Sequence, residues 1–94
     1  MSDFKLKIKA IIKNELGLHA RPASLFVETT KKFKSKIQIT KNGKTVDAKS
    51  IISVLTLGVE KGDEVEIICE GEDAEEACRA IKNLIEKLSE LEKQ

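Results

Sequence analysis

The eight residues GLHARPAS (17–24) lie where a strand-like sequence gives way to a helix-like one, and this change sets the topology of the chain. His19 and Pro22 are the only histidine and the only proline among the 94 residues. The first N–H groups of a helix have no intrahelical acceptor, and proline suits a first turn because it has no N–H to lose. We therefore expect His19 to stand at or just before a helix N-terminus.

The residue types around His19 point to anion chemistry. Unpaired N–H groups and the positive end of the helix dipole favour a nearby phosphate or carboxylate. Arg21 adds a fork-shaped guanidinium suited to phosphate oxygens. A histidine titrates near neutral pH, so its unprotonated ring can act as a nucleophile. The pattern favours a histidine that accepts a phosphoryl group, and the simpler alternative is a histidine that caps the helix or lies on the surface.

Length and charge narrow the class of protein. The chain is long enough for one domain (1–94) with a core built from Ile, Leu, Val and Ala. Residues 1–49 hold twelve basic and four acidic side chains, whereas residues 50–94 hold five and twelve. The basic half alone could indicate nucleic acid, but there is no aromatic stacking platform and no RNA-binding signature. A solvated lysine face on a strand is the favoured explanation.

The sequence offers no sign of a membrane segment, a metal site or a nucleotide cofactor. No stretch reaches the roughly 18 to 20 apolar residues of a membrane span, and the first residues alternate instead of forming an apolar signal region. We therefore expect a cytoplasmic protein. Cys69 and Cys78 are too few for a zinc site and are expected to be small buried thiols without a disulfide. There is no Gly-rich P-loop and no obvious cluster of Mg²⁺ ligands.

Hydrophobic periodicity predicts the first strand and the flanking helices. Apolar residues at positions 4, 6, 8, 10 and 12 alternate with Lys5, Lys7, Lys9 and Ile11, which is typical of a strand with one wet face. A helix is expected from about Ala20 to Lys32, with the buried positions Ala23, Phe26, Val27, Thr30 and, less centrally, Phe33. The last helix is expected from Ala74 onward, and its apolar stripe consists of Ala77, Cys78, Ile81, Leu84, Ile85, Leu88 and Leu91.

Turn and cap residues separate the remaining elements. Asn42-Gly43 predicts a type I′ hairpin between short strands around residues 37–39 and Val46, because both turn positions tolerate positive φ. Ser50 is a candidate N-cap of a short helix that Gly58 ends, and a fourth strand is expected over residues 65–69. Asp73 with Glu76 is a candidate cap pair for the last helix. The resulting α+β order, β-α-β-β-α-β-α, predicts an antiparallel sheet with three helices on one face.

With these elements in place, the chain resembles the HPr family, the histidine-containing phosphocarriers of the bacterial phosphoenolpyruvate-dependent phosphotransferase system. The resemblance covers nearly the whole chain. Residues 17–24, followed by Phe26-Val27, resemble the family's active-site signature, and VDAKSIISVLTLG (46–58) resembles its regulatory serine region. The resemblance implies an open-faced β-sandwich with strand order 1-4-2-3. It also implies a monomer, which is the family precedent.

The resemblance also implies a chemical role for the first motif. His19 would accept a phosphoryl group from phospho-enzyme I on ring Nδ1 and pass it to IIA domains of sugar permeases. Arg21 would assist, and the helix start at Ala20 and Arg21 would contact the phosphate. The protein would be a stoichiometric carrier, not an enzyme, and would need no cofactor and no metal.

The second motif carries regulatory expectations. The resemblance implies phosphorylation of Ser50 by an HPr kinase/phosphorylase and leaves room for a transcriptional regulator as a partner, although capping alone also explains Ser50. Ile51, Ile52 and Leu55 are candidate docking residues, with the division between core and surface left open for Ile52, Leu55 and Leu57.

Two other functions stay open. Leu16 stands where many sugar-branch members have a small polar residue, and residues 14–17 resemble carriers of the nitrogen-regulatory branch. A regulatory carrier that does not serve sugar uptake is therefore one alternative. A docking module that is never phosphorylated is the other, and the presence of His19 and Arg21 argues against it.

Overall fold

The structure, a computed structural model, describes residues 4–93. Its elements follow the order expected from the sequence: β1 (Phe4–Ile11), α1 (Ala20–Thr30), β2 (Lys36–Lys41), β3 (Lys44–Asp47), α2 (Ile51–Leu57), β4 (Glu64–Gly71) and α3 (Ala74–Leu91). Two boundaries differ slightly from the prediction. The first strand ends at Ile11 instead of residue 12, and α1 ends at Thr30, two residues earlier than expected.

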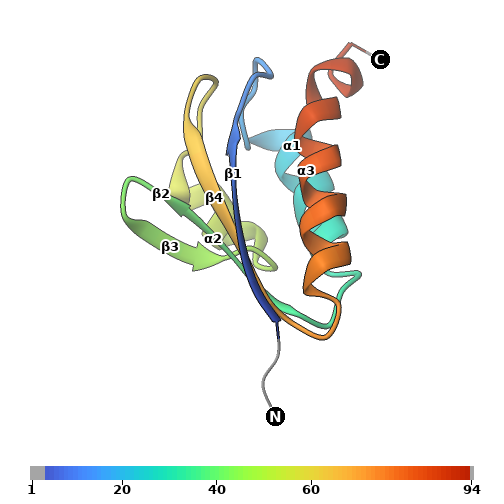
Figure 1. The fold of residues 1–94 in the computed structure, drawn as a ribbon. Helices are drawn as coiled ribbons and strands as arrows, with labels where there is room; N and C mark the ends of the chain where they lie inside the picture. The colour runs from blue at the N-terminus through green and yellow to red at the C-terminus, as the bar shows by residue number, and fades with distance from the viewer. Residues whose placement is uncertain (1–3, 94) are drawn as a thin grey trace.

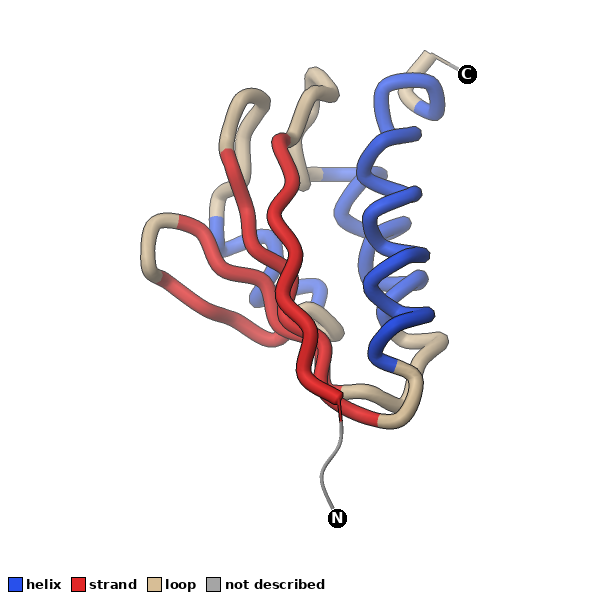
Figure 2. The backbone as a smooth tube through the Cα atoms, viewed as in Figure 1, coloured by secondary structure: helices blue, strands red, loops and turns tan. Residues whose placement is uncertain are grey.

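The four strands form one antiparallel sheet in the order β1-β4-β2-β3. Central strand β4 pairs with β1 through Ile8↔Ile67 and with β2 through Ile39↔Ile67. Helix α3 packs against β1 and β4, α2 packs against β3, and α1 contacts both other helices. Figures 1 and 2 show the sheet on one side and α1 with α3 on the other. The predicted HPr-like fold is confirmed.

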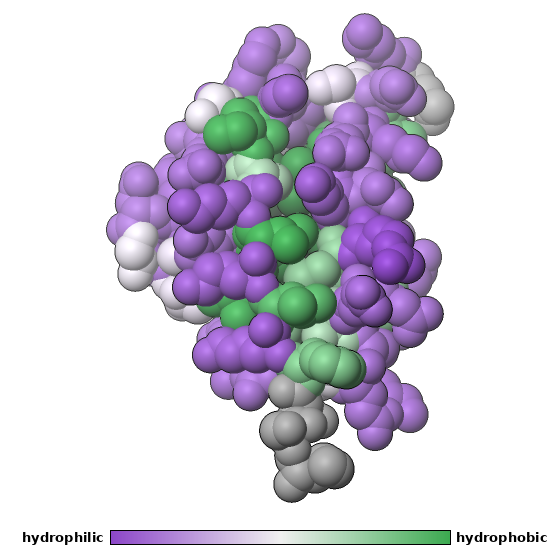
Figure 3. Space-filling view, in the orientation of Figure 1, coloured by the Kyte–Doolittle hydropathy of each residue, from purple (hydrophilic) through white to green (hydrophobic). Residues whose placement is uncertain are grey.

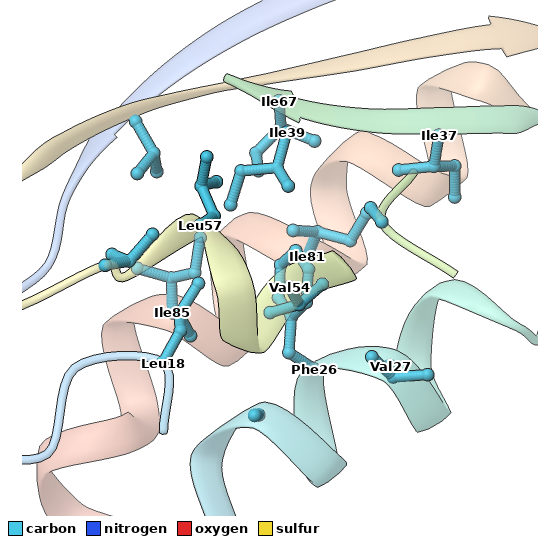
Figure 4. Packing of buried hydrophobic residues seen from close by; sticks show 14 of the residues in the cluster. Leu18, Phe26, Val27, Ile37, Ile39, Val54, Leu57, Ile67, Ile81 and Ile85 are labelled. Atoms are coloured by element: carbon cyan, nitrogen blue, oxygen red, sulfur yellow. The ribbon is translucent and has the colours of Figure 1, made fainter. Parts of the chain in front are cut away.

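The core lies between the sheet and the helices. Its members come from both layers and are nearly all aliphatic (Figure 4): Leu18, Phe26, Val27, Ile37, Ile39, Val54, Leu57, Ile67, Ile81 and Ile85 are labelled there. Among the aromatic side chains of residues 4–93, Phe26 is fully buried, Phe33 is half-buried against the cluster and Phe4 is exposed. Burying each such side chain stabilises the fold by about 1.5–3 kcal/mol.

The opposite face of the sheet is charged. Lys5, Lys7 and Lys9 are exposed on β1, and the register sets Lys5 beside Glu70 and Lys9 beside Glu66 of β4. Opposite charges on neighbouring strands are mildly stabilising. The lysines therefore form the solvated face expected from the sequence. Figure 3 shows an interrupted hydrophobic strip along β1, between the charged side chains of the sheet and those of α3.

Two of the predicted turn signals are confirmed by backbone geometry. Asn42 and Gly43 have φ of 50° and 81°, the positive values that a type I′ turn requires. Gly58 has φ 71° and ends α2 in the left-handed conformation. Both sites stop an element where the sequence predicted a stop.

The predicted cap pair of Asp73 with Glu76 is wrong. Asp73 stands at the N-cap position of α3, but its carboxylate makes no side-chain cap bond to that helix. It accepts hydrogen bonds from Lys34 N and Ser35 N, both at 2.9 Å, and from Ser35 Oγ at 2.5 Å. These bonds, first the one from the Ser35 hydroxyl, hold the pKa of Asp73 below its ordinary value. The loop between α1 and β2 supplies three hydrogen-bond donors to the Asp73 carboxylate, which therefore binds this loop and not the N–H groups of α3.

Both cysteines face the core, as predicted. Cys69 and Cys78 are buried and free, and burial with the neighbouring Cys78 thiol raises the pKa of Cys69. Within residues 4–93, no three His, Cys, Asp or Glu side chains are arranged to hold a metal ion. Nor is any helix in this part of the chain both long and apolar enough to cross a bilayer.

Candidate functional site

His19 stands at the N-cap of α1, as the sequence predicts. Its backbone is extended (φ −122°, ψ 161°), and the helix begins at Ala20. Ala20 itself has a left-handed φ of 53°, which is uncommon for a residue with a Cβ. A non-glycine residue in this region costs about 1–2 kcal/mol and persists only where its surroundings enforce it. The backbone at the start of α1 is therefore held under strain beside the histidine.

The imidazole of His19 makes no bond to the start of its own helix. Its Nε2 lies 3.1 Å from Oε2 of Glu60, and the two side chains are 34% and 67% exposed. Nδ1 has no hydrogen-bond partner among residues 4–93. The alternative of a histidine that caps the helix is thus not what the structure shows. Within the described part of the chain, Nε2 is therefore hydrogen-bonded and Nδ1 is not.

The loop before His19 is packed tightly on the loop between α2 and β4. Leu18 N donates to Val59 O at 3.0 Å, and Gly62 N donates to Ile12 O at 2.6 Å. A Cβ on Gly17 would lie 2.3 Å from Val59 O, so only glycine fits there. Lys61 Nζ and Glu15 Oε2 form an ion pair at 2.5 Å across the same two loops. This pairing lowers the pKa of Glu15.

The last residues of the described chain also hold this loop. Glu92 accepts hydrogen bonds from Glu15 N at 3.0 Å and Leu16 N at 3.3 Å, and from the side-chain amide of Asn14. Asn14 is buried, and its Nδ2 also donates to Gly17 O at 2.8 Å. The chain after α3 and the loop before His19 therefore support one another.

Arg21 lies exposed on the first turn of α1. Its guanidinium forms no ion pair with any carboxylate among residues 4–93. Beside it is a small cleft of about 100 Å³, lined by Leu16, Pro22, Leu25, Leu88, Leu91, Glu92 and Arg21 itself. Arg21 is thus a cation at the helix start that no carboxylate of the described residues neutralises.

Ser50 is the N-cap of α2, as predicted. Its Oγ accepts a hydrogen bond from Ser53 N at 3.3 Å, and its carbonyl accepts from Val54 N at 3.0 Å. The side chain is half-buried. The second helix start is therefore closed by its own hydroxyl, in contrast to the start of α1.

Helix α2 divides its apolar residues between the core and the surface. Val54 and Leu57 are buried, whereas Ile51, Ile52 and Leu55 are 36%, 71% and 39% exposed. Residues three and four apart share a helix face, so the three exposed residues form one apolar surface, here called the α2 patch. Leu57 belongs to the core, which settles the division that the sequence left open.

Sequence reasoning missed three residues of this site: Glu60, Asn14 and Glu92. Glu60 contacts His19 across 41 positions, and Glu92 contacts Asn14 across 78, so no local pattern connects them. Glu60 N donates to Asp63 Oδ2 at 2.7 Å, so Glu60 lies in an ordered turn, but no sequence pattern indicates its contact with His19.

Comparison with known proteins identifies close relatives. A sequence model described as the PTS HPr component phosphorylation site matches residues 6–87. The phosphocarrier protein HPr of Mycoplasma pneumoniae is 42% identical over 82 residues, covering 86% of this chain and 93% of that protein. The multiphosphoryl transfer protein of Salmonella typhimurium is 40% identical over 90% of this chain, but the matched part spans only 23% of that longer protein.

Solved structures give the same picture. HPr-C-His from Thermoanaerobacter tengcongensis is 48% identical with a TM-score of 0.87, covering 89% of this chain and 94% of that one. An HPr dimer from the same organism is 49% identical with a TM-score of 0.73 over 87% and 94%. Crh, the Bacillus subtilis catabolite repression HPr, is 39% identical with a TM-score of 0.71 over 87% and 95%. Because one neighbour is a dimer, these structures do not support the expectation of a monomer.

Proposed function

The chain belongs to the HPr family of phosphotransferase-system phosphocarriers, and from this membership we propose that it carries a phosphoryl group on His19. The donor is phospho-enzyme I, and the acceptors are IIA domains of sugar permeases. The observation that carries the proposal is Nδ1 of His19, which has no hydrogen-bond partner among residues 4–93 and lies at the start of α1, where no side chain of these residues forms a cap. We also propose the cytoplasm as the place of this relay, in keeping with the family.

In this proposal, His19 Nδ1 attacks the phosphorus of the phosphohistidine on enzyme I. A new P–N bond forms while the old P–N bond breaks, and its electron pair returns to the enzyme I ring. The N–H groups of Ala20 and Arg21 and the guanidinium of Arg21 stabilise the phosphoryl oxygens. Phosphoryl transfer depends mainly on positioning and charge stabilisation. An open helix start supplies both and also allows the group to leave again.

Partner docking is assigned to the α2 patch. Ile51, Ile52 and Leu55 are apolar, exposed and on one helix face. Apolar side chains at the centre of an interface contribute through burial, whereas charged residues at its rim mainly set partner choice. In the reaction catalysed by enzyme I, the Ile52→Ser variant is expected to be a substrate with a higher KM than the wild type, and this increase is expected to exceed the decrease in kcat.

Ser50 is proposed as a regulatory phosphorylation site for an HPr kinase/phosphorylase, and a transcriptional regulator is a candidate reader of the modified form. A phosphate would add about −1.5 to −2 charges next to the α2 patch. It would lie at a helix start, where negative charge does not destabilise the helix. It would instead repel acidic partner residues. Ser50→Asp is therefore expected to accept phosphate from enzyme I more slowly than the wild type, and an equal rate would reject this role.

A regulatory carrier is the second candidate function. The similarity to Crh and the exposed Leu16 in the loop before His19 favour it. Such a carrier would still accept phosphate on His19 but would deliver little or none to sugar-specific IIA domains. Measuring transfer from the phosphorylated protein to a panel of IIA domains separates the two functions.

The central test is a phosphorylation assay with purified enzyme I and labelled phosphoenolpyruvate. The wild type is expected to acquire an acid-labile label, and His19→Ala is expected to acquire none. Glu90→Gln, on the exposed side of α3, serves as a control that should label normally. If the wild type stays unlabelled with several enzyme I types, the carrier role is rejected and a docking module becomes the leading explanation.

A further inference from the structure

Glu60 contacts the imidazole of His19, and no sequence pattern predicted this contact. Its Oε2 lies 3.1 Å from Nε2 of the ring. Among residues 4–93 it has no other ion-pair partner, because Lys61 is paired with Glu15 and Lys41 with Asp63. A carboxylate that faces one ring nitrogen requires a proton on that nitrogen.

The surrounding loop holds Glu60 in this position. Glu60 N donates to Asp63 Oδ2 at 2.7 Å, and Asp63 N donates back to Glu60 O at 3.0 Å. Lys41 Nζ lies 2.9 Å from the same Asp63 carboxylate and donates to Gly58 O at 2.6 Å. The bond from Glu60 N, followed by the one from Lys41, lowers the pKa of Asp63. An ionised Asp63 therefore fixes the backbone from which Glu60 extends.

The two backbones that carry Glu60 and His19 are also in direct contact. Leu18 N bonds to Val59 O at 3.0 Å, and the space above Gly17 is filled by Val59 O and the Cα of Glu60. The residues immediately before each of the two side chains are thus joined to one another. The carboxylate–imidazole contact does not depend on long flexible side chains alone.

We propose that Glu60 is the charge partner of His19 in phosphoryl transfer, an inference that rests on the proposed carrier function. The carboxylate accepts a hydrogen bond from Nε2–H and so leaves the lone pair on Nδ1. As Nδ1 forms its bond to phosphorus, the ring becomes positively charged while the proton stays on Nε2. Glu60 stabilises this developing charge, as a carboxylate does for histidine in hydrolytic triads.

The exposure of the pair limits the expected size of the effect. Solvent and salt screen exposed charges, and a side chain that is 67% exposed is not held in one place. An exposed ion pair of this kind corresponds to about a threefold effect on an equilibrium or a rate. Glu60 is therefore expected to tune the carrier without being essential for labelling.

The test compares the wild type with Glu60→Gln and with Glu64→Gln, an exposed carboxylate outside the described ion pairs. Because the chain has a single histidine, the ¹⁵N NMR signals of its neutral ring report the tautomer without overlap. Phosphoramidate, which phosphorylates histidine without an enzyme, gives the rate at His19 in the absence of enzyme I.

For Glu60→Gln we expect the ratio of the Nε2–H to the Nδ1–H tautomer to fall about threefold and the phosphoramidate rate to fall by a similar factor. Glu64→Gln should match the wild type in both measurements. An unchanged tautomer ratio or an unchanged rate in Glu60→Gln would overturn the inference. Failure of enzyme I to label the wild type would reject the carrier role instead, and the phosphoramidate comparison would still decide the role of Glu60.

Discussion

The first N–H groups of a helix have no acceptor within the helix, and the starts of α1 and α2 differ in whether a side chain caps these groups. At α2, the Ser50 hydroxyl accepts a bond from Ser53 N, and the helix start is satisfied from within. At α1, the side chain of His19 turns away from the helix to Glu60, and Ala20 adopts a strained left-handed φ. The start of α1 is therefore held by contacts between loops, and no side chain of residues 4–93 caps its N–H groups.

The strongest test compares Gly17, in the loop before α1, with Gly58, which ends α2, by replacing each with alanine. Gly17 and Gly58 have similar φ values of 60° and 71°, but a Cβ meets Val59 O at 2.3 Å in the first case and nothing within 4 Å in the second. We expect Gly58→Ala to cost about 1–2 kcal/mol. Gly17→Ala is expected to cost about 3 kcal/mol or more, since a steric overlap is added.

Denaturant unfolding of the two variants measures this contrast, and labelling by enzyme I shows its effect on the site. Gly17→Ala is expected to lose most of its phosphoryl acceptance, whereas Gly58→Ala keeps it. Equal stabilities of the two variants would show that the loop contacts at Gly17 are looser than the structure indicates.

The second test concerns Arg21, which pairs with no carboxylate of residues 4–93. Arg21 and Arg79 are the only arginines of the chain, and both are exposed. Arg21→Gln is expected to lower the rate of phosphoryl acceptance about tenfold, because one charge-assisted contact to the phosphate is lost. Arg79→Gln on α3 has the same change in charge and should leave the rate unchanged. Similar rates for the two variants would remove Arg21 from the proposed site.

The third test compares the two cap residues directly. Ser50→Ala removes a cap bond and is expected to lower the free energy of unfolding by about 1 kcal/mol. His19→Ala removes no cap bond, so its effect on stability should be less than about 0.5 kcal/mol. Thermal unfolding of both variants measures the difference. A large loss of stability in His19→Ala would mean that the histidine supports the helix after all.

The fourth test concerns Asp73 at the start of α3, where we expect the smallest effect. The pKa of Asp73 lies below its ordinary value of 3.8, first because of the Ser35 hydroxyl, so its contribution to stability is present above pH ~4 and is lost as the pH falls through the folded-state pKa. Asp73→Asn should therefore unfold a few degrees below the wild type at pH 7. The gap should narrow as the pH falls below about 4, because the carboxyl of the wild type then becomes protonated. A gap independent of pH would show that the charge of Asp73 is irrelevant.

The fold was largely predictable because its signals are local. These signals are the alternation over residues 4–12, the Asn42-Gly43 turn, and the start and stop signals of α2 at Ser50 and Gly58. Each depends on a few neighbouring residues, and each was confirmed. Asp73 shows where local rules fail. Its sequence spacing to Glu76 suits a cap. However, the backbone N–H groups of Lys34 and Ser35, which are distant in the sequence, donate hydrogen bonds to its carboxylate instead.

The candidate site was predictable only in part. The position of His19 followed from the strand-to-helix change and from Pro22, both of which are local. The contacts of Glu60 with His19 and of Glu92 with residues 14–16 exist only after the sheet has formed, because they join loops at the end of different elements. A charged residue in an exposed loop carries no sequence pattern that distinguishes such a role.

The burial of both cysteines has a practical consequence for spectroscopy. Both thiols are buried and therefore poorly accessible to reagents, and burial also raises the pKa of Cys69, which lowers its share of the reactive thiolate. A cysteine introduced on the surface, for example Ser24→Cys in α1, would then react with a maleimide dye much faster than Cys69 or Cys78. Partner binding at the start of α1 could thus be followed by fluorescence without first removing the native thiols and disturbing the core.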